Sequence, residues 1–498
     1  MHPLARLDRA SLWHPFTQMR DWLRREPIVI VSGNGARLRD VRGREYLDGN
    51  SSIWTNLHGH NHPKMNAAIR RQLKKIAHSS ALGLANEPAS VLAAKLVQAA
   101  NPAIHDLRFT VYEPGKPKAR QSQIANRKLA KVFFSDDGST AMEVALKLAY
   151  EFARRTGRSK KPRFLSLAQA YHGDTVGAVS LGHSDLFRKA YSGLLFRSDT
   201  VMAPYCYRCP FNRARPERAD AREYRRCRWE CVGKVEQRFE EQKKRGNPYA
   251  ALAVEPLIQG AAGMIPHPAG WLGRVAGITR VHGAQLIADE VMTGFGRTGD
   301  PSTINHRPST SLFACHHEWV QPDFLALAKG LTGGYLPMAA TLTTQEVFDA
   351  FVGEYEEFKS FFHGHSYTAN QLGAAAALAS LEILQSPASV RARQRLEQTL
   401  HDELDTLWPV PNVGDIRQVG LIVGVELVRD WRTREAFHLR ERAGIRVCDA
   451  MARRGVLTRP IGNVIVLMAP YCTTPAQARK MVGALRAGIE DVFGKRRV

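Results

Sequence analysis

Long apolar runs, an export signal and a dense set of cysteines are all missing from this 498-residue chain. No stretch approaches the roughly 20 consecutive apolar residues that a membrane-spanning helix needs. The first residues, MHPLARLDRASLWHPFTQM, include Asp8, His14 and Pro15 and contain no apolar segment of the kind found in signal peptides. Seven cysteines are an odd and small number for a disulfide framework. We therefore expect a cytoplasmic protein with reduced thiols and no membrane association.

Acidic residues are also few relative to basic ones, so the net charge is +23. Nucleic-acid-binding proteins are one class that uses such a charge. The excess is spread widely and is denser around 107–130 and 205–232, where neither stretch has the interleaved aromatic residues of a single-strand binding platform. We expect a basic solvated surface and no nucleic-acid partner.

Short apolar runs alternate with helical patterns through residues 131–345. The runs are KVFFS, RFLSL, ALAVEP, QLIADEV, DFLALA and MAATLTT. This alternation is typical of an α/β fold with a mainly parallel sheet covered by helices. A second mixed α/β region begins near residue 388, with VGLIVGVELV and NVIVLMAP as its expected strands. Because 498 residues are too many for one simple hydrophobic core, we expect a large domain and a smaller one.

Two N-terminal segments and three insertions complete the predicted organisation. Residues 28–48, IVIVSGNGARLRDVRGREYLD, predict short antiparallel strands joined by glycine turns. Across residues 63–100, Ala, Leu and Val recur three and four apart, which predicts helix. Residues 107–130, 205–232 and 300–310 are expected to be surface loops or insertions.

The insertion at 205–232 holds four of the seven cysteines. Cys206, Cys209, Cys227 and Cys231 have the spacing C-x2-C-x17-C-x3-C, which is close to that of a structural zinc site. An arginine-rich loop with reduced thiols is the alternative. The spacing does not decide between the two, and we assign no metal.

Residues 133–149, FFSDDGSTAMEVALKLA, predict a strand, a tight turn and a helix that begins near Gly138 and Ser139. The start of a helix offers free N–H groups and the positive end of the helix dipole, and both suit a phosphate. An ordinary N-cap is the alternative. On this helix Glu143 and Lys147 are expected to pair, opposite an apolar face made of Ala141, Val144, Ala145 and Leu148.

Two charged residues close apolar strands. In LIADEVMTGFGRTG, residues 286–299, the strand ends on Asp289, and a buried carboxylate needs a partner. In PDFLALAKGLTGGYLPMA, residues 322–339, Lys329 follows a strand and opens a glycine-rich loop. A desolvated lysine has a lowered pKa and becomes a usable amine nucleophile, whereas most lysines are simply solvated.

The helix start, Asp289 and Lys329 are all expected at the carboxyl edge of the sheet, where ligands bind. Pyridoxal phosphate needs this set, because it has a phosphate, a pyridine nitrogen best kept protonated, and an aldehyde that reacts with lysine. In QAYHGDTVGAVS, residues 169–180, Tyr171 is a candidate to stack on the ring, and packing in the interior is the alternative. The sequence therefore predicts a pyridoxal-phosphate enzyme.

The motifs SDDGSTAMEVALKLA, YHGDT, LIADEVMTGFGRTG and LALAKGLTGG resemble the class III pyridoxal-phosphate aminotransferases of fold type I. The resemblance runs over nearly the whole chain outside the insertions. It implies a large cofactor-binding domain at residues 51–387 and a small α/β domain built from residues 1–50 and 388–498. It also implies that Lys329 binds the cofactor aldehyde and moves a proton, that Asp289 contacts the pyridine nitrogen, and that Gly138 and Ser139 hold the phosphate.

Within this family, LWHPFTQM, DGNSSIWTNLHGHNHP, FFHGHSYTANQLG, VGDIRQVGLIVGVELV and LTRPIGNVIVLMAPY are similar to the 8-amino-7-oxononanoate aminotransferases of biotin biosynthesis. The similarity implies a ping-pong reaction that yields 7,8-diaminononanoate. The implied substrate-binding residues are Phe16, Ile53, Trp54, Tyr171, Gly364 and Arg459. Arg459 would clamp the substrate carboxylate. His365 and Ser366 would reach the phosphate of a neighbouring subunit's cofactor, so a homodimer with shared active sites is expected.

The amino donor stays open between S-adenosylmethionine and L-lysine. Members that use adenosylmethionine carry Tyr where this chain has Phe16, and Trp where it has Ile53. A missing hydroxyl and a missing indole weaken adenosyl recognition and leave the chemistry intact. The alternative function is another class III aminotransferase that acts on ω-amino acids or diamines, with the same cofactor site and a different substrate pocket.

Overall fold

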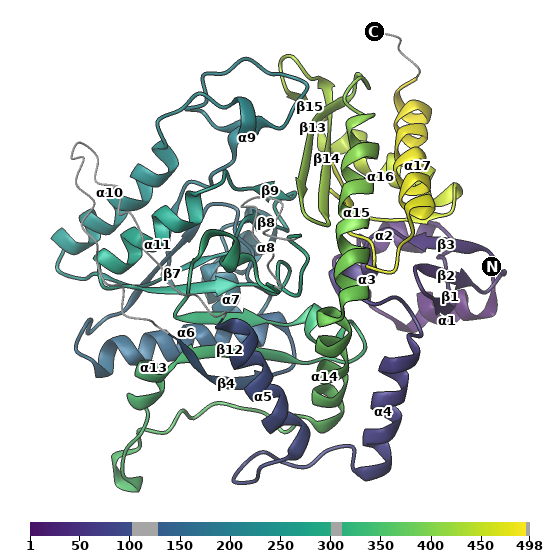
Figure 1. Cartoon of the computed structure of the whole chain (residues 1–498). Helices are drawn as coiled ribbons and strands as arrows, with labels where there is room; N and C mark the ends of the chain where they lie inside the picture. The colour runs from purple at the N-terminus through teal and green to yellow at the C-terminus, as the bar shows by residue number, and fades with distance from the viewer. Residues whose placement is uncertain (102–127, 300–310, 495–498) are drawn as a thin grey trace.

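The computed structural model of the chain describes residues 1–101, 128–299 and 311–494 (Figure 1). Within these ranges, no helix combines the length and the apolar character needed to cross a membrane. The insertion predicted at 300–310 lies outside the described residues, as does 107–127. Leu129 and Ala130 already belong to a strand, so the predicted loop is wrong at its end.

A seven-stranded sheet lies at the centre of the larger part of the molecule, with the order β4-β12-β11-β10-β7-β5-β6. Its strands are β4 (Leu129–Ser135), β5 (Arg163–Leu167), β6 (Asp199–Val201), β7 (Tyr249–Val254), β10 (Gln285–Asp289), β11 (Phe324–Leu327) and β12 (Ala339–Thr344). Neighbouring strands are parallel except that β12 runs antiparallel to both β11 and β4. The predicted mainly parallel sheet is confirmed, and only the three-residue β6 lies outside the predicted runs.

Different helices cover the two faces of this sheet, because side chains alternate along each strand. In β7, Ala251 and Ala253 belong to one buried cluster, and Leu252 and Val254 belong to another. The first cluster includes α6 (Gly138–Arg155) and α7 (Val176–Leu181). The second includes α5 (Glu87–Ala100), α10 (Glu230–Lys244), α11 (Trp271–Val281) and α14 (Gln371–Gln385).

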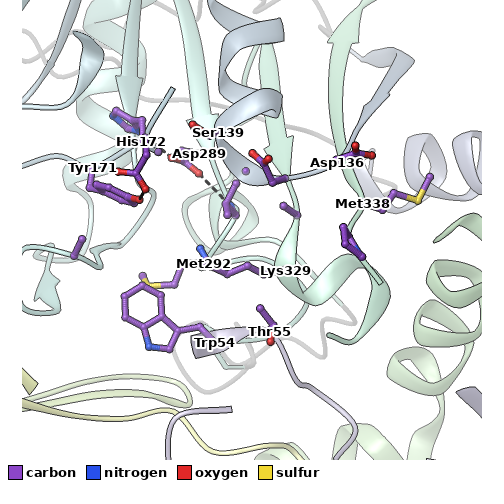
Figure 2. A pocket seen from close by; sticks show the side chains of 18 of the residues that line it. Trp54, Thr55, Asp136, Ser139, Tyr171, His172, Asp289, Met292, Lys329 and Met338 are labelled. Carbon is purple, nitrogen blue, oxygen red and sulfur yellow. Dashed lines mark hydrogen bonds and ion pairs between the residues drawn. The ribbon is translucent and has the colours of Figure 1, made fainter. Parts of the chain in front are cut away.

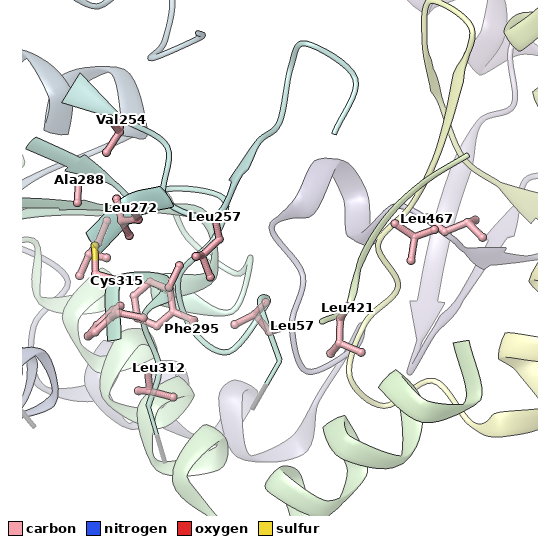
Figure 3. Close-up of a cluster of buried hydrophobic side chains, with 14 of the residues drawn as sticks. Leu57, Val254, Leu257, Leu272, Ala288, Phe295, Leu312, Cys315, Leu421 and Leu467 are labelled. Carbon is pink, nitrogen blue, oxygen red and sulfur yellow. The ribbon is translucent and has the colours of Figure 1, made fainter. Parts of the chain in front are cut away.

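The second cluster continues from the sheet into the C-terminal part of the chain. Figure 3 shows Leu57 between Ala288 of β10 and Leu421, which precedes a C-terminal strand. All three side chains are buried. A continuous core therefore fixes the segment around Leu57 relative to the strands that it packs against.

The N-terminal segment forms a small sheet with β1 (Ile30–Asn34), β2 (Arg37–Asp40) and β3 (Glu45–Asp48), as predicted for residues 28–48. Helices α1 (Pro3–Ser11) and α2 (Met19–Arg24) precede it, and α3 (Ser51–Trp54) follows it. Strand β16 (Val456–Leu457) pairs with β3 in parallel, so both ends of the chain contribute to one sheet. The predicted helical region is two helices, α4 (Pro63–Lys75) and α5, separated by residues 76–86.

The C-terminal region is an antiparallel sheet packed by helices, and both strands expected there are present. Its strands are β13 (Val413–Val419), β14 (Ile422–Asp430), β15 (Glu435–Ala436), β17 (Pro460–Ile461) and β18 (Val464–Leu467). Its helices are α15 (Pro387–Asp405), α16 (Ala443–Arg453) and α17 (Pro475–Phe493). The short elements elsewhere are α8 (Asp185–Arg188), α9 (Ala221–Tyr224), α13 (Gln345–Asp349), β8 (Ile258–Gln259) and β9 (Ile265–Pro266).

The insertion at 205–232 is more ordered than the predicted loop. It contains a 3-10 turn, α9 and the start of α10, and it docks on β14 through Glu426. The Glu426 carboxylate accepts hydrogen bonds from Tyr205 Oη at 2.7 Å and from Arg208 Nε at 2.8 Å. Buried polar groups need such partners, so these bonds hold the insertion against the C-terminal sheet.

The four cysteines of the insertion are free thiols. Burial raises the pKa of Cys206 and of Cys231 to about 12, which keeps both protonated at neutral pH. The structure contains no group of three or more His, Cys, Asp or Glu side chains that could hold a metal ion, as far as the described residues extend.

Candidate active site

A pocket of about 720 Å³ lies at the carboxyl edge of the seven-stranded sheet (Figure 2). It is lined by the loops that follow β4, β5, β10 and β11, and by residues 54–55 from the N-terminal segment. Carboxyl ends of parallel strands are where open α/β sheets bind ligands. Of the predicted site residues, the pocket brings together Trp54, Gly138, Ser139, Tyr171, Asp289 and Lys329.

Lys329 stands two residues beyond the end of β11 and opens a 3-10 turn. Its φ of +42° lies in the left-handed region, which a residue with a side chain adopts at a cost. Burial lowers the pKa of Lys329, and the negative charges of Asp289 and Glu255 oppose this only in part. A lysine with a lowered pKa presents more of the neutral amine, the form that attacks a carbonyl.

Asp289 is the last residue of β10, and its carboxylate is held by His172. The Nδ1 atom of His172 lies 2.8 Å from Oδ2 of Asp289, and Oδ1 accepts a hydrogen bond from Val291 N at 3.2 Å. Both His172 and Asp289 are buried. The carboxylate is therefore fixed at the pocket wall, with the imidazole behind it.

Glu255 is a further acid in the pocket, and the sequence interpretation missed it. It follows β7, and its oxygens accept hydrogen bonds from Tyr171 N at 3.2 Å and Gly260 N at 2.8 Å. Burial raises the pKa of Glu255 to about 7. The signal was present in ALAVEP, where a carboxylate closes an apolar strand just as Asp289 does.

The start of α6 forms one end of the pocket. Asp137 is the N-cap residue, and Gly138 and Ser139 occupy the first turn, where N–H groups have no acceptor within the helix. Ser139 Oγ lies 2.9 Å from Thr175 Oγ1 and accepts a hydrogen bond from Thr175 N at 2.8 Å. A Cβ atom on Gly138 would lie 2.6 Å from Val291 Cγ1, so only glycine lets the helix start this close to the strand that carries Asp289.

The predicted pairing of Glu143 with Lys147 on α6 is wrong. The Glu143 carboxylate instead accepts hydrogen bonds from Thr175 Oγ1 and from the backbone of Gly177 and Ala178, at the start of α7. The positive end of a helix dipole stabilises a carboxylate. Glu143 therefore binds the start of α7 and not the side chain of Lys147. The predicted apolar face of α6 is buried.

Aromatic side chains form a row beside Tyr171. The Tyr171 ring lies 4.8 Å from the ring of Phe187, which in turn lies 5.9 Å from Phe16, with ring centres as the reference points. Tyr171 Oη donates to Asp174 Oδ2 at 2.7 Å, and burial raises the pKa of the phenol. Phe187 was not predicted, because nothing in its sequence surroundings marks it.

The pocket lining does not include the predicted substrate residues Phe16, Ile53 and Arg459. Phe16 and Ile53 are 63% and 44% exposed, and Arg459 is exposed as well. An Nη atom of Arg459 donates to the carbonyl oxygen of Phe16 at 3.3 Å. Arg459 and Phe16 therefore contact each other, but neither of them lines the pocket.

Gly364, His365 and Ser366 are also absent from the lining residues. His365 approaches the pocket from outside, with its Nδ1 atom 3.5 Å from Oδ2 of the lining residue Asp136. All three residues of the segment are exposed.

The pocket residues fit pyridoxal phosphate. The amine of Lys329, the carboxylate of Asp289 and the helix start at Gly138 supply the three chemical groups that the cofactor needs, and Tyr171 offers an aromatic face. The pocket volume falls in the usual range for small-molecule sites. Lys329 is the one Lys or Arg among the described lining residues.

Comparisons with known proteins agree with this geometry. The model of the family "Aminotransferase class-III" matches residues 19–489. The adenosylmethionine-8-amino-7-oxononanoate aminotransferase of Geobacter sulfurreducens is 44% identical over 98% of this chain and 97% of that protein. The crystal structure of the protein of the same name from Methanocaldococcus jannaschii has a TM-score of 0.83 at 37% identity and covers 98% of each chain. A PLP-bound amine transaminase from an uncultivated Pseudomonas species has a TM-score of 0.81 at 31% identity, covering 97% of this chain and 98% of that one.

Proposed function

The chain belongs to the class III aminotransferase family, and from this premise we propose that it transaminates 8-amino-7-oxononanoate to 7,8-diaminononanoate in biotin biosynthesis. The observation that carries the proposal is the joint presence of Lys329, Asp289 and the α6 start in one pocket. Relatives at 35–44% identity over nearly the whole chain are named for this substrate, which supports its choice over ω-amino acids or diamines. We propose that the reaction takes place in the cytoplasm.

Pyridoxal phosphate, when bound, supplies an aldehyde for the amine and a ring that withdraws electrons from the substrate carbon. Lys329 Nζ would hold that aldehyde and, when free, would accept and return the proton at the reacting carbon. Asp289 would contact the ring nitrogen and favour its protonated form, and Tyr171 would cover one face of the ring. Gly138 and Ser139 would bind the phosphate through backbone N–H groups and the Ser139 hydroxyl.

We propose a homodimer in which each subunit completes the other's phosphate site. The phosphate end of the pocket carries Asp136, Asp137 and Asp174, so its own charge opposes an anion. His365 and Ser366 do not line the pocket of their own subunit, and we propose that they reach the pocket of the partner. Exposed aromatic side chains flank this segment, and such patches favour association: Phe358, Phe362 and Tyr367 are 66%, 72% and 59% exposed.

Mixing two inactive variants tests the shared site. A Lys329→Ala subunit paired with a His365→Ala subunit has one site with both defects and one with neither. Activity is expected to return on mixing, and the sedimentation coefficient is expected to be that of a dimer. Two variants that stay inactive together, in a sample shown to contain mixed dimers, contradict shared sites.

We propose S-adenosylmethionine as the amino donor, since the relatives carry it in their names. Phe16 and Ile53 are the two positions that favour L-lysine instead. Arg459 is proposed to clamp the acceptor carboxylate, together with Gly364 and Trp54 as parts of the substrate channel.

The deciding experiment is an assay of diaminononanoate formation from 8-amino-7-oxononanoate, with adenosylmethionine and lysine compared as donors. We expect ping-pong kinetics and turnover with adenosylmethionine. Lys329→Ala is expected to abolish turnover, while Lys147→Ala, which removes a lysine of α6 outside the pocket, is expected to keep it. Amination of pyruvate without amination of 8-amino-7-oxononanoate would assign the chain to the ω-amino acid or diamine group.

A further inference from the structure

Residues Ser51–Trp54 form one turn of left-handed helix. Their φ angles are 45°, 49°, 65° and 66°, and the turn closes through hydrogen bonds from Trp54 N to Asn50 O at 2.8 Å and from Thr55 N to Ser51 O at 3.0 Å. L-residues avoid this conformation because the Cβ atom approaches the next carbonyl oxygen, and glycine alone escapes the penalty. None of the four residues is glycine, and Ile53 is β-branched. Such backbone persists only where its surroundings over-determine it.

Asp48 is the group that holds this turn. It is the buried last residue of β3, and its carboxylate accepts three hydrogen bonds from the turn and its approach. Oδ1 accepts from Ser52 N at 3.0 Å and from Asn50 N at 3.3 Å, and Oδ2 accepts from Ser52 Oγ at 2.9 Å. The two bonds from Ser52 are made in its left-handed conformation, so Asp48 stabilises that conformation.

His60 fixes the Asp48 carboxylate from the other side. Nε2 of His60 lies 3.0 Å from Oδ2 of Asp48, and Nδ1 lies 3.0 Å from Nδ2 of Asn56. An amide nitrogen donates, so Nδ1 accepts and the proton of a neutral imidazole lies on Nε2. Asn56 Oδ1 in turn accepts from Gly59 N at 2.8 Å, which fixes the orientation of the amide. Each donor in this series of hydrogen bonds therefore meets an acceptor.

The left-handed turn sets the position of the Trp54 side chain. Trp54 Nε1 donates to Asn50 Oδ1 at 2.8 Å, and the indole lines the pocket with its ring centre 5.5 Å from Lys329 Nζ. In Figure 2 the indole lies next to Lys329 and Met292. A right-handed or extended backbone at residues 51–54 would point this side chain in another direction, because φ and ψ set the direction of Cβ.

We propose that Asp48 is a positioning residue that acts through the left-handed turn to place Trp54 against the acceptor, and so sets acceptor binding without touching substrate itself. This inference rests on the proposed function for the identity of the acceptor. Asp48 ends a strand of the small N-terminal sheet, far along the chain from Lys329.

Asp48→Asn tests the role, with Asp40→Asn as a matched control. Asn retains one acceptor oxygen but turns the other into a donor, which faces the donors Ser52 Oγ and His60 Nε2. Asp40 is likewise buried in the same sheet and accepts four hydrogen bonds, from Arg42 N, Arg44 N, Arg44 Nε and Tyr46 Oη. It does not line the pocket. We expect Asp48→Asn to lower kcat/KM for the acceptor by about tenfold to a hundredfold, and Asp40→Asn to affect only the unfolding midpoint.

A glycine rescue separates positioning from general destabilisation. In the Asp48→Asn background, Ile53→Gly relieves the left-handed penalty, whereas Ile53→Ala removes the same side chain and keeps the penalty. We expect Ile53→Gly to restore most of the acceptor kcat/KM and to raise the unfolding midpoint of the cofactor-free protein above that of Ile53→Ala. Equal kinetic loss in Asp48→Asn and Asp40→Asn overturns the proposal, and so does an equal midpoint for the glycine and alanine variants. The midpoint needs no substrate, so it decides the role of the turn even if 8-amino-7-oxononanoate is not the acceptor.

Discussion

His172 and Asp289 form a buried pair in which Nδ1 lies 2.8 Å from Oδ2. Burial alone would lower the pKa of His172, but the hydrogen bond and the charge of Asp289 outweigh it and raise the pKa above the ordinary value. The imidazole therefore holds the Asp289 carboxylate through this hydrogen bond at the place where the cofactor nitrogen is proposed to lie. His172 is therefore part of the site, because it contacts the carboxylate of Asp289.

Replacing His172 with Phe is expected to weaken the function of Asp289 while leaving Lys329 in place. A hydrogen bond to a charged group contributes about 1.5–3 kcal/mol, which corresponds to a loss of roughly tenfold to a hundredfold in cofactor affinity or kcat. Cofactor affinity follows from absorbance titration of the cofactor-free protein. His267→Phe replaces another buried histidine outside the pocket lining and serves as the control. Equal cofactor affinity in the two variants would contradict the role of His172.

Gly173 is predicted to be essential for phosphate binding. Its φ is +123°, and a Cβ atom there would collide with Oγ of Ser139. Gly173→Ala is therefore expected to displace the Ser139 hydroxyl and to weaken binding of pyridoxal phosphate more than binding of pyridoxal, which has no phosphate. Gly157→Ala provides the control, because Gly157 has a φ of +69° and a Cβ atom added there would have no atom of the described residues within 4 Å, so the backbone penalty of about 1 kcal/mol stands alone. A similar loss of affinity for both ligands would show that the defect is not at the phosphate.

The large sheet was predictable because each buried strand is a continuous apolar run with helical sequence between. Asp289 and Lys329 were predictable for a related reason, since a charge that closes such a run needs an explanation. The same reasoning holds for Glu255, whose carboxyl also follows an apolar strand, although this residue was not predicted. The antiparallel direction of β12 was beyond reach, because an apolar run reads the same in either direction.

Side chains that meet only in three dimensions were the part that the sequence did not reveal. His172 pairs with Asp289 across 117 positions of chain, and Glu143 turns to the start of α7 instead of to Lys147. The left-handed turn at Ser51–Trp54 contradicts the local preference of every residue in it. Such choices are made by tertiary contacts, which local propensity does not contain.

The pH dependence of stability is expected to carry the signature of Glu255. The carboxyl ionises near its ordinary pKa of 4.5 in the unfolded chain and near 7 in the folded protein, where burial opposes the charge. Between these values the native state binds more protons, so the unfolding free energy falls as pH rises. Chemical denaturation of the cofactor-free protein at pH 5, 6 and 7 measures the slope. Glu255→Gln is expected to flatten it, and an unchanged slope would mean that Glu255 titrates normally. Asp349→Asn, on an exposed helix of the large domain, controls for the loss of one carboxyl.

The docking of the insertion on the C-terminal sheet is expected to depend on Arg417. Its Nε lies 2.8 Å from Oδ2 of Asp415, and its guanidinium also pairs with Glu426, with all three side chains buried. Arg417→Met leaves two carboxylates in the interior without this partner, so we expect a loss of about 3–5 kcal/mol in unfolding free energy. Arg429 forms a pair with Glu441 at 2.6 Å on the surface, where solvent screens the charges. Arg429→Met is accordingly expected to cost much less than Arg417→Met. Urea unfolding of both variants decides the matter, because similar losses would mean that the buried cluster contributes no more than a surface pair.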